Sequence, residues 1–325
     1  MNKPIAIIAG EPNSISSEII FKSWKLRRNY SHRPIIVIGS IDLLNLQKKY
    51  LKYSIKIRKI EKNFNSQKHN KNELLVYDVK YKQKKSFEKV SSKSSKYIFN
   101  CFKIAINLIK NKKVLGIINC PVSKEALFKK KHQGITEFLA KKTGFSGNEV
   151  MLIYNKKLSV SPITTHVPLI EVNKKIKKYE IIKKIKIINN FFKINLKKTP
   201  TIGILGLNPH NFSKKKKGDS QKEILSAIKI IRKLKIRVLG PISPDTSFML
   251  FQKYKLNVIL GMYHDQVLTP FKALFKYDAI NITLGLPFLR ISPDHGIAEN
   301  IAGKKVADPA SLIQCIKFFN YVKTP

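Results

Sequence analysis

Short apolar runs alternate with longer amphipathic stretches along almost the whole chain, and this alternation limits the folds open to it. The short runs hold about four to eight residues, which is typical of strands buried on both faces. The stretches between them repeat apolar residues at helical spacing; Ile181, Ile185 and Ile188, for example, are four and three residues apart. This alternation predicts an α/β fold around a largely parallel sheet.

The same pattern predicts where the elements lie. We expect strands at residues 5–9, 34–38, 74–77, 114–119, 150–154, 159–164, 201–207, 257–261 and 279–284. We expect helices at residues 16–28, 96–109, 136–142, 175–192, 221–234 and 310–322. The polar region 61–85 predicts loops around one strand. For the lysine-dense helix 175–192, a membrane-surface helix is the alternative to a packed one.

The charge balance limits the classes of molecule that the chain is expected to bind. The 325 residues include 63 Lys and Arg against 20 Asp and Glu, a net charge of +43, and only seven of the basic residues are arginine. Nucleic-acid readers rely on arginine, so this excess indicates lysine-covered solvated faces rather than a nucleic-acid surface. The positive field favours small anionic substrates. We expect neither nucleic acid nor membrane as a partner.

The cysteines and the chain start indicate the compartment. Three widely separated cysteines form neither a disulfide framework nor a CxxC metal motif. No apolar run is long enough to cross a bilayer, and the N-terminus lacks a signal-peptide pattern. We therefore predict a soluble cytoplasmic protein.

Three of the seven histidines follow directly after predicted strands. His166 closes SVSPITTH, His210 closes TIGILGLNPH and His264 closes NVILGMYH. Ligands bind at the carboxyl ends of strands in open α/β sheets, because the loops converge there. Three imidazoles in this setting favour a divalent metal with an open position for substrate. Hydrogen-bonded structural histidines are the alternative.

Polar residues near these histidines are candidates for supporting roles. Asp265 beside His264, and Asp245 in PISPDTS, are candidates for proton transfer or for orienting a ligand, or equally for turns and caps. Lys272, Asn281 and Arg290 are the groups that a phosphorylated, carboxylated substrate requires. For Arg290 a structural ion pair is the alternative.

No GxGxxG motif follows the first strand, where the chain reads AGEPNSISSEI. The standard dinucleotide-binding fingerprint is therefore absent. The segment PDHG, with Asp294, His295 and Gly296, is the best remaining candidate for a cofactor loop, because its glycine permits close backbone approach. An ordinary turn is the alternative.

Several motifs together resemble one family. They are GEP with SEI at 17–19, NCPVSKEAL at 119–127, GITEFLA at 134–140, TTHVPL at 164–169, GLNPH at 206–210, MYHDQ at 262–266 and NITLGLPFLRISPDHG at 281–296. In this order the chain resembles the 4-hydroxythreonine-4-phosphate dehydrogenases of pyridoxal phosphate (vitamin B6) synthesis. The resemblance covers nearly the whole sequence.

The resemblance implies a fold similar to the isocitrate and isopropylmalate dehydrogenases, with two α/β/α domains flanking a cleft. The expected domains are 1–130 with 296–325, and 131–295, the second carrying most of the metal and substrate residues. The family oxidises its substrate with NAD and one divalent metal ion per site (Zn, Co or Mg), and loss of CO₂ then gives 3-amino-2-oxopropyl phosphate. A homodimer that shares its metal sites is implied.

The resemblance also implies roles for single residues. The metal ligands match His166, His210 and His264. The substrate-binding residues match Thr136, Lys272, Asn281 and Arg290. We assign catalytic roles to Lys272, Asp245 and Asp265, and cofactor binding to Asp294, His295 and Gly296.

One departure from the family pattern keeps other functions open. Ile135 stands where the family has a substrate-binding histidine, and it can donate no hydrogen bond. A sister dehydrogenase for another phosphorylated hydroxy acid, such as a four-carbon sugar acid phosphate, is therefore an alternative. A remote one is a basic nucleic-acid-binding protein on a retired enzyme scaffold.

Overall fold

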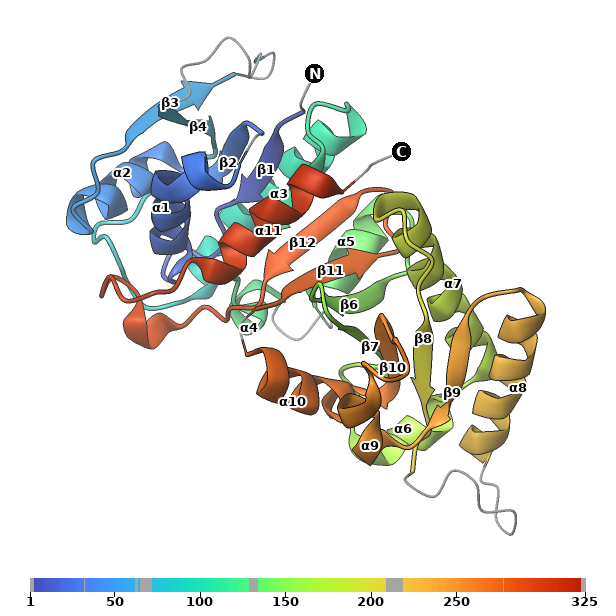
Figure 1. Cartoon of the computed structure of the whole chain (residues 1–325). Helices are drawn as coiled ribbons and strands as arrows, with labels where there is room; N and C mark the ends of the chain where they lie inside the picture. Colours follow the sequence, from blue (N-terminus) through green and yellow to red (C-terminus); the bar gives the residue numbers. More distant parts are fainter. Residues whose placement is uncertain are drawn as a thin grey trace. The chain divides into compact units, whose positions relative to one another are not determined.

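The chain folds into two compact units (Figure 1). The computed structural model describes residues 3–31, 33–61, 64, 72–128, 134–208, 219–276 and 278–322. Within these residues, unit 1 spans 1–139 and 287–321, and unit 2 spans 140–286 with Val322. The expected return to the first domain was at residue 296. The chain returns at 287 instead, because strand β12 (Leu289–Pro293) pairs with β5 (Gly116–Asn119) of unit 1.

The sheet of unit 1 is entirely parallel across its described pairs. Its order is β3-β4-β2-β1-β5-β12. The strands not yet given are β1 (Ile5–Ile8), β2 (Ile35–Gly39), β3 (Lys56–Ile60) and β4 (Glu73–Asp78). Every residue of β1 and β2 is buried, which explains their uninterrupted apolar sequences.

Helices cover both faces of this sheet (Figure 1). Helix α1 packs against α2 and α11 on one face, and α3 packs on β1 and β2 on the other. The helices of unit 1 are α1 (Ser16–Leu26), α2 (Ile41–Tyr50), α3 (Ser95–Lys110), α4 (Lys124–Phe128) and α11 (Ala310–Tyr321). Helix α5 (Ile135–Thr143) begins in unit 1 and ends in unit 2. Short 3-10 turns lie at Arg27–Asn29, Ser92–Ser94 and Glu299–Ile301.

Unit 2 has a mixed sheet in the order β11-β6-β7-β10-β8-β9. Strand β6 pairs antiparallel with both neighbours, and the pairs from β7 to β9 are parallel. The strands are β6 (Val150–Tyr154), β7 (Ser159–Thr164), β8 (Ile202–Leu205), β9 (Val238–Ile242), β10 (Val258–Tyr263) and β11 (Ile280–Leu284). The helices are α6 (Leu169–Lys175), α7 (Lys178–Asn195), α8 (Asp219–Lys233), α9 (Pro244–Leu250) and α10 (His264–Phe275).

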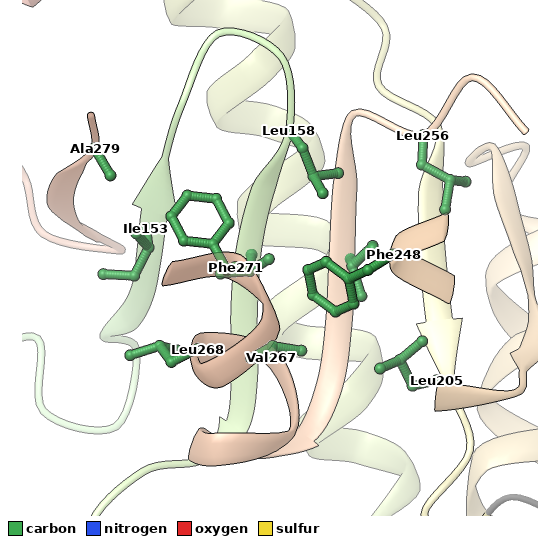
Figure 2. Close-up of a cluster of buried hydrophobic side chains, with 11 residues drawn as sticks. Ile153, Leu158, Leu205, Phe248, Leu256, Val267, Leu268, Phe271 and Ala279 are labelled. Carbon is green, nitrogen blue, oxygen red and sulfur yellow. The ribbon is translucent and has the colours of Figure 1, made fainter. Parts of the chain in front are cut away.

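A buried apolar cluster joins α9 and α10 to one face of this sheet (Figure 2). Val267, Leu268 and Phe271 of α10 pack on the strands, beside Phe248 of α9. The other members are Ile153, Leu158, Val160, Leu205, Leu256, Ile259 and Ala279. This packing fixes α10, whose first residue is His264.

The predicted α/β fold class is confirmed, and each predicted strand and helix is present. The predicted helix 175–192 forms as α7, which begins at Lys178, after α6 has ended at Lys175. The membrane-surface alternative for it is wrong, because Ile181, Ile185 and Ile188 are fully buried. In the region 61–85, strand β4 is present, while residues 62–63 and 65–71 lie outside the described chain.

Some elements were not predicted. Strand β3 is an edge strand whose sequence, KIRKI, is mostly polar, and β12 contains Arg290 and Pro293. Helix α10 begins directly at the end of β10 and contains Pro270, so no sequence signal separates strand from helix. Strand β9 and helices α2, α4, α6 and α9 were also missed. Among the described helices, none is long and apolar enough to cross a membrane.

Candidate functional site

Two of the three predicted histidines meet at the carboxyl ends of adjacent strands in unit 2. Strands β7 and β10 are parallel neighbours, with Thr164 opposite Tyr263 where both end. His264 follows β10 directly, and His166 lies two residues beyond β7. Their ring centroids are 6.3 Å apart, with 33° between the ring planes. The register of the sheet thus brings together two side chains that are far apart in the sequence.

The histidine pair is wider than a tetrahedral ion would hold it. Two imidazoles that each place a nitrogen about 2.0–2.1 Å from one ion have ring centres about 5 Å apart in tetrahedral geometry, and at most about 6.5 Å apart when they lie on opposite sides of the ion. The observed separation of 6.3 Å lies near the upper limit. The third predicted ligand, His210, lies outside the described residues. Among the residues that are described, no group of three His, Cys, Asp or Glu side chains is arranged to hold a metal.

Asp265 contacts His264 in a way that suits a metal ligand. The Nδ1 atom of His264 lies 2.7 Å from Oδ1 of Asp265, which leaves Nε2 as the ring nitrogen directed away from this contact. A carboxylate on one ring nitrogen fixes the orientation of the imidazole and makes the other nitrogen a better ligand. Asp245 instead accepts a hydrogen bond from Ser243 Oγ at 2.7 Å, in the first turn of α9. Helix α9 has no side-chain cap hydrogen bond at Ser243, so the cap alternative for Asp245 is not shown.

Lys272 lies at the opposite end of α10 from the histidines. The eight residues from His264 to Lys272 correspond to about 12 Å along the helix axis. Its side chain is exposed. This separation suits a group that binds one end of a substrate while the histidines act on the other end. It does not suit proton transfer at an atom held between the two rings.

Asn281 presents a buried acceptor on β11. Its Oδ1 atom is buried and has no hydrogen-bond partner among the described residues. A buried polar atom without a partner costs free energy unless a ligand or water completes it. This orphaned oxygen would accept a hydrogen bond from a hydroxyl or amine group of a substrate.

Arg290 is buried within unit 1. It is 4% exposed, and its Nε donates to Oδ1 of Asn119 at 2.6 Å, across the β12–β5 pair. Burial lowers the pKa of Arg290 to about 10, and the neighbouring Cys315 and Glu137 oppose this shift. The guanidinium remains charged at neutral pH and is held in one orientation by the interior of the unit.

Thr136 and Ile135 begin helix α5 in unit 1. Thr136 is half-buried, while Ile135 is 5% exposed and belongs to the hydrophobic interior. The position where the family has a substrate-binding histidine is therefore used here for packing. His132, the one histidine near it in the sequence, lies outside the described residues.

The loop 294–296 of unit 1 has features that suit a ligand. Nδ1 of His295 is buried without a hydrogen-bond partner in the described chain. Burial lowers the pKa of His295, while Asp308 and Asp294 oppose the shift, so the ring is neutral near pH 7. At Gly296 an added Cβ would meet no atom within 4 Å, which leaves its backbone open to a close approach. The Asp294 N–H donates to Ser311 Oγ at 2.9 Å and ties the loop to α11.

Sequence reasoning gave no role to two buried polar side chains, Glu11 and Gln266. Glu11 is 1% exposed, accepts a hydrogen bond from Ser94 Oγ at 3.1 Å, and has its pKa raised by burial. Gln266 is buried at the start of α10 and bonds to two strand ends. The available signal was a polar residue beside a buried run, in GEP and in MYHDQ.

The chain matches known proteins over nearly its whole length. Residues 31–319 match the family model described as pyridoxal phosphate biosynthetic protein PdxA. A 4-hydroxythreonine-4-phosphate dehydrogenase from Sulfurihydrogenibium sp. is 37% identical over 320 residues, covering 96% of each chain. The D-threonate 4-phosphate dehydrogenase of Salmonella typhimurium is 33% identical, covering 97% of each.

Solved structures agree with these matches. The crystal structure of 4-hydroxythreonine-4-phosphate dehydrogenase from Klebsiella pneumoniae is similar with a TM-score of 0.86 and 30% identity, covering 98% of this chain and 97% of that one. A β-decarboxylating dehydrogenase from Thermococcus kodakarensis is similar in fold alone, with a TM-score of 0.51 and 12% identity. The predicted likeness to the isocitrate and isopropylmalate dehydrogenase fold is confirmed at this level.

Proposed function

The chain belongs to the pyridoxal phosphate biosynthetic protein PdxA family, and from this premise we propose that it is the dehydrogenase that oxidises 4-phosphohydroxy-L-threonine with NAD. The secondary alcohol loses two electrons and two protons; hydride goes to NAD and the remaining proton to water. The 3-keto acid then loses CO₂ and gives 3-amino-2-oxopropyl phosphate. The proposal includes one divalent ion (Zn, Co or Mg) per site and a homodimer.

The observation that carries the proposal is the pairing of His166 and His264 at the ends of β7 and β10. Together with His210, which follows the neighbouring strand β8 in the sequence, they would hold the ion. A divalent ion bound there would acidify the substrate hydroxyl and polarise the carbonyl that develops from it. Asp265 orients His264 for this task through the contact at Nδ1.

The other residues of unit 2 position the substrate. Lys272 would bind an anionic end of it, because its place at the far end of α10 fits a group distant from the reacting carbon. Asn281 Oδ1 would accept a hydrogen bond from the substrate amine or hydroxyl, which would give this buried oxygen a partner. Both interactions hold the alcohol in one orientation, which lowers the entropy cost of reaction.

Unit 1 would contribute fixed charge and the cofactor loop. Arg290 offers a planar fork for a carboxylate or phosphate and is kept charged and oriented in the interior. Thr136 would add a hydroxyl group to the residues that bind the substrate. The loop of Asp294, His295 and Gly296 would bind NAD, the hydride acceptor, through the neutral ring of His295 and the open backbone at Gly296.

A second candidate substrate is a four-carbon sugar acid phosphate. Two observations favour it: position 135 holds a buried isoleucine, and the relative from Salmonella typhimurium is named for D-threonate 4-phosphate. This substrate carries a hydroxyl where 4-phosphohydroxy-L-threonine carries an amine. The metal, the cofactor loop and the roles of Lys272 and Arg290 would be the same.

The test measures NADH formation by absorbance with each of the two substrates, after loading with Zn²⁺, Co²⁺ or Mg²⁺. We expect turnover with 4-phosphohydroxy-L-threonine, at a higher kcat/KM than with D-threonate 4-phosphate. The reverse order would establish the second candidate. Absence of NADH formation with both substrates under every metal would contradict the proposed reaction.

A further inference from the structure

Buried polar side chains join the strand ends that carry the histidines of unit 2. Oε1 of Gln266 accepts a hydrogen bond from the Met262 N–H at 2.7 Å, at the end of β10. Nε2 of Gln266 donates to the carbonyl of Gly206 at 2.9 Å and to that of Leu207 at 3.4 Å, directly after β8. One amide therefore connects the ends of two strands.

A second side chain extends this connection to β7. Oγ1 of Thr164 donates to the carbonyl of Met262 at 2.8 Å. The backbone of Met262 is thus bonded twice: its N–H donates to Gln266, and its carbonyl accepts from Thr164. Thr164 and Gln266 are 7% and 9% exposed, so solvent does not compete for these bonds.

The connected backbone positions each precede a histidine by a few residues in the sequence. Thr164 precedes His166 by two residues, Met262 precedes His264 by two, and Leu207 precedes His210 by three. Hydrogen bonds of these two side chains thus link the ends of β7, β10 and β8. Polar side chains therefore occupy two buried positions, 164 and 266, where apolar side chains would otherwise pack.

Close packing holds Gln266 in place. A Cβ added to Gly261 would lie 3.0 Å from Gln266 Oε1 and 2.4 Å from Val267 Cγ1. Glycine in β10 therefore gives the first turn of α10 the space to lie against the strand. Val267 and Leu268 anchor the same turn in the apolar cluster (Figure 2).

We propose that Gln266 and Thr164 are positioning residues that set the spacing of the histidine-bearing strand ends, and thereby the affinity of this site for a divalent ion. The inference rests on the proposed function, because it requires that the histidines bind a metal. Residues that orient ligands from behind typically change metal affinity by about 10- to 100-fold when they are mutated. Neither side chain needs to touch the substrate.

The test titrates the metal-free full-length protein with Co²⁺ and records the visible absorption spectrum, with affinity measured by competition against a chromophoric chelator. Gln266→Met keeps the side-chain length and removes both hydrogen bonds. Thr164→Val keeps the shape and removes the donor. We expect each variant to bind Co²⁺ about 10- to 100-fold more weakly, with an altered Co²⁺ spectrum, and Thr164→Ser to restore affinity.

The chain offers a matched control in unit 1. Gln47 is a buried glutamine whose Nε2 also donates to two loop carbonyls, those of Pro12 at 2.7 Å and Ser86 at 2.9 Å. Gln47→Met should lower thermal stability as Gln266→Met does, while Co²⁺ affinity stays at the wild-type value. This separates a loss of metal binding from a general loss of stability.

The outcomes distinguish the inference from the function on which it rests. If wild-type protein binds no Co²⁺, the proposed metal chemistry fails. If wild-type protein binds Co²⁺ and His264→Ala abolishes binding, while Gln266→Met or Thr164→Val binds as wild type does, the positioning role is overturned and the proposed function stands. Should Gln266→Met fail to fold, Thr164→Val with its serine rescue decides the question.

Discussion

The candidate residues of the two units lie in different surroundings. In unit 2 the two histidines follow the ends of strands, with His166 exposed and His264 half-buried, and Lys272 is exposed near the far end of α10. In unit 1, Arg290 is in the interior, and Nδ1 of His295 is buried. The sheets differ as well, since that of unit 1 is all-parallel and that of unit 2 turns antiparallel at β6.

The two units therefore hold their candidate residues in place in different ways. A group at a strand end is held by its neighbours and can be removed at small cost to folding. A group in the interior is held by packing and hydrogen bonds, so its removal costs stability as well as binding. Mutations of the exposed or half-buried strand-end groups of unit 2 should therefore affect chemistry with little change in stability, and mutations of the buried groups of unit 1 should affect chemistry and stability together.

The largest expected effect is that of His264→Ala in unit 2. A metal ion contributes several kcal/mol of transition-state stabilisation, so loss of a ligand should lower kcat/KM by about 10³-fold or more. The melting temperature should change little, because the ring is partly exposed and lies outside the apolar cluster. Steady-state NADH formation and thermal melting measure the two effects. Undiminished activity would contradict the metal assignment.

Arg290→Lys in unit 1 should affect both properties. Lysine keeps the charge but cannot present the planar fork, and a lost hydrogen bond to a charged group costs about 1.5–3 kcal/mol, or about 10- to 150-fold in KM. The melting temperature should fall as well, because the bond to Asn119 is buried.

Arg33 provides the control for this change. Its Nε donates to the carbonyl of Phe319 at 2.8 Å, also within unit 1. Arg33→Lys should lower the melting temperature and leave KM unchanged. Equal KM values for Arg290→Lys and wild type would assign Arg290 to a structural role and remove it from the substrate site.

The smallest effect is a pH dependence that arises in unit 1. Burial lowers the pKa of His295 below its ordinary value of 6.5, so the unfolded chain binds this proton at a higher pH than the folded protein does. The contribution of His295 to stability is therefore complete above pH 6.5 and decreases as the pH falls toward its folded pKa. One proton gives a slope of at most about 1.4 kcal/mol per pH unit.

Urea unfolding of wild type and His295→Gln between pH 5 and 7 checks this prediction. The variant should show a flatter decrease in stability below pH 6.5. The difference between the two proteins cancels the contributions of the other histidines. Parallel curves would show that the ring of His295 is solvated in the folded protein, against its buried placement.

Much of the fold could be predicted because its strands are buried on both faces. IAII, IIVIG and IGIL are continuous apolar runs; β1 and β8 form within the predicted ranges, and β2 extends one residue beyond its predicted range. Elements without that signal were missed. KIRKI pairs only with β4 at a sheet edge, and LRISP forms β12 although it contains an arginine and a proline. These two segments form strands because neighbouring strands pair with them, and their local composition does not predict it.

Within the candidate site, sequence reasoning placed His166 and His264 at strand ends correctly, because a strand-to-loop boundary is a local feature. The distance between their rings depends on β7 and β10 being parallel neighbours in register, although the two histidines are 98 positions apart in the chain. The same holds for Gln266, whose role depends on carbonyls of a strand some 60 residues earlier.

The amino-acid sequence alone determined the α/β class, the resemblance to a dehydrogenase family and the residue types available for chemistry. These depend on periodicity and on short motifs, which are properties of neighbouring residues. Only the tertiary structure decided which histidines approach each other, that Arg290 and Ile135 are interior, and that Lys272 lies a helix length from the histidine pair. Contacts between distant segments follow from strand order and packing, and no local pattern encodes them.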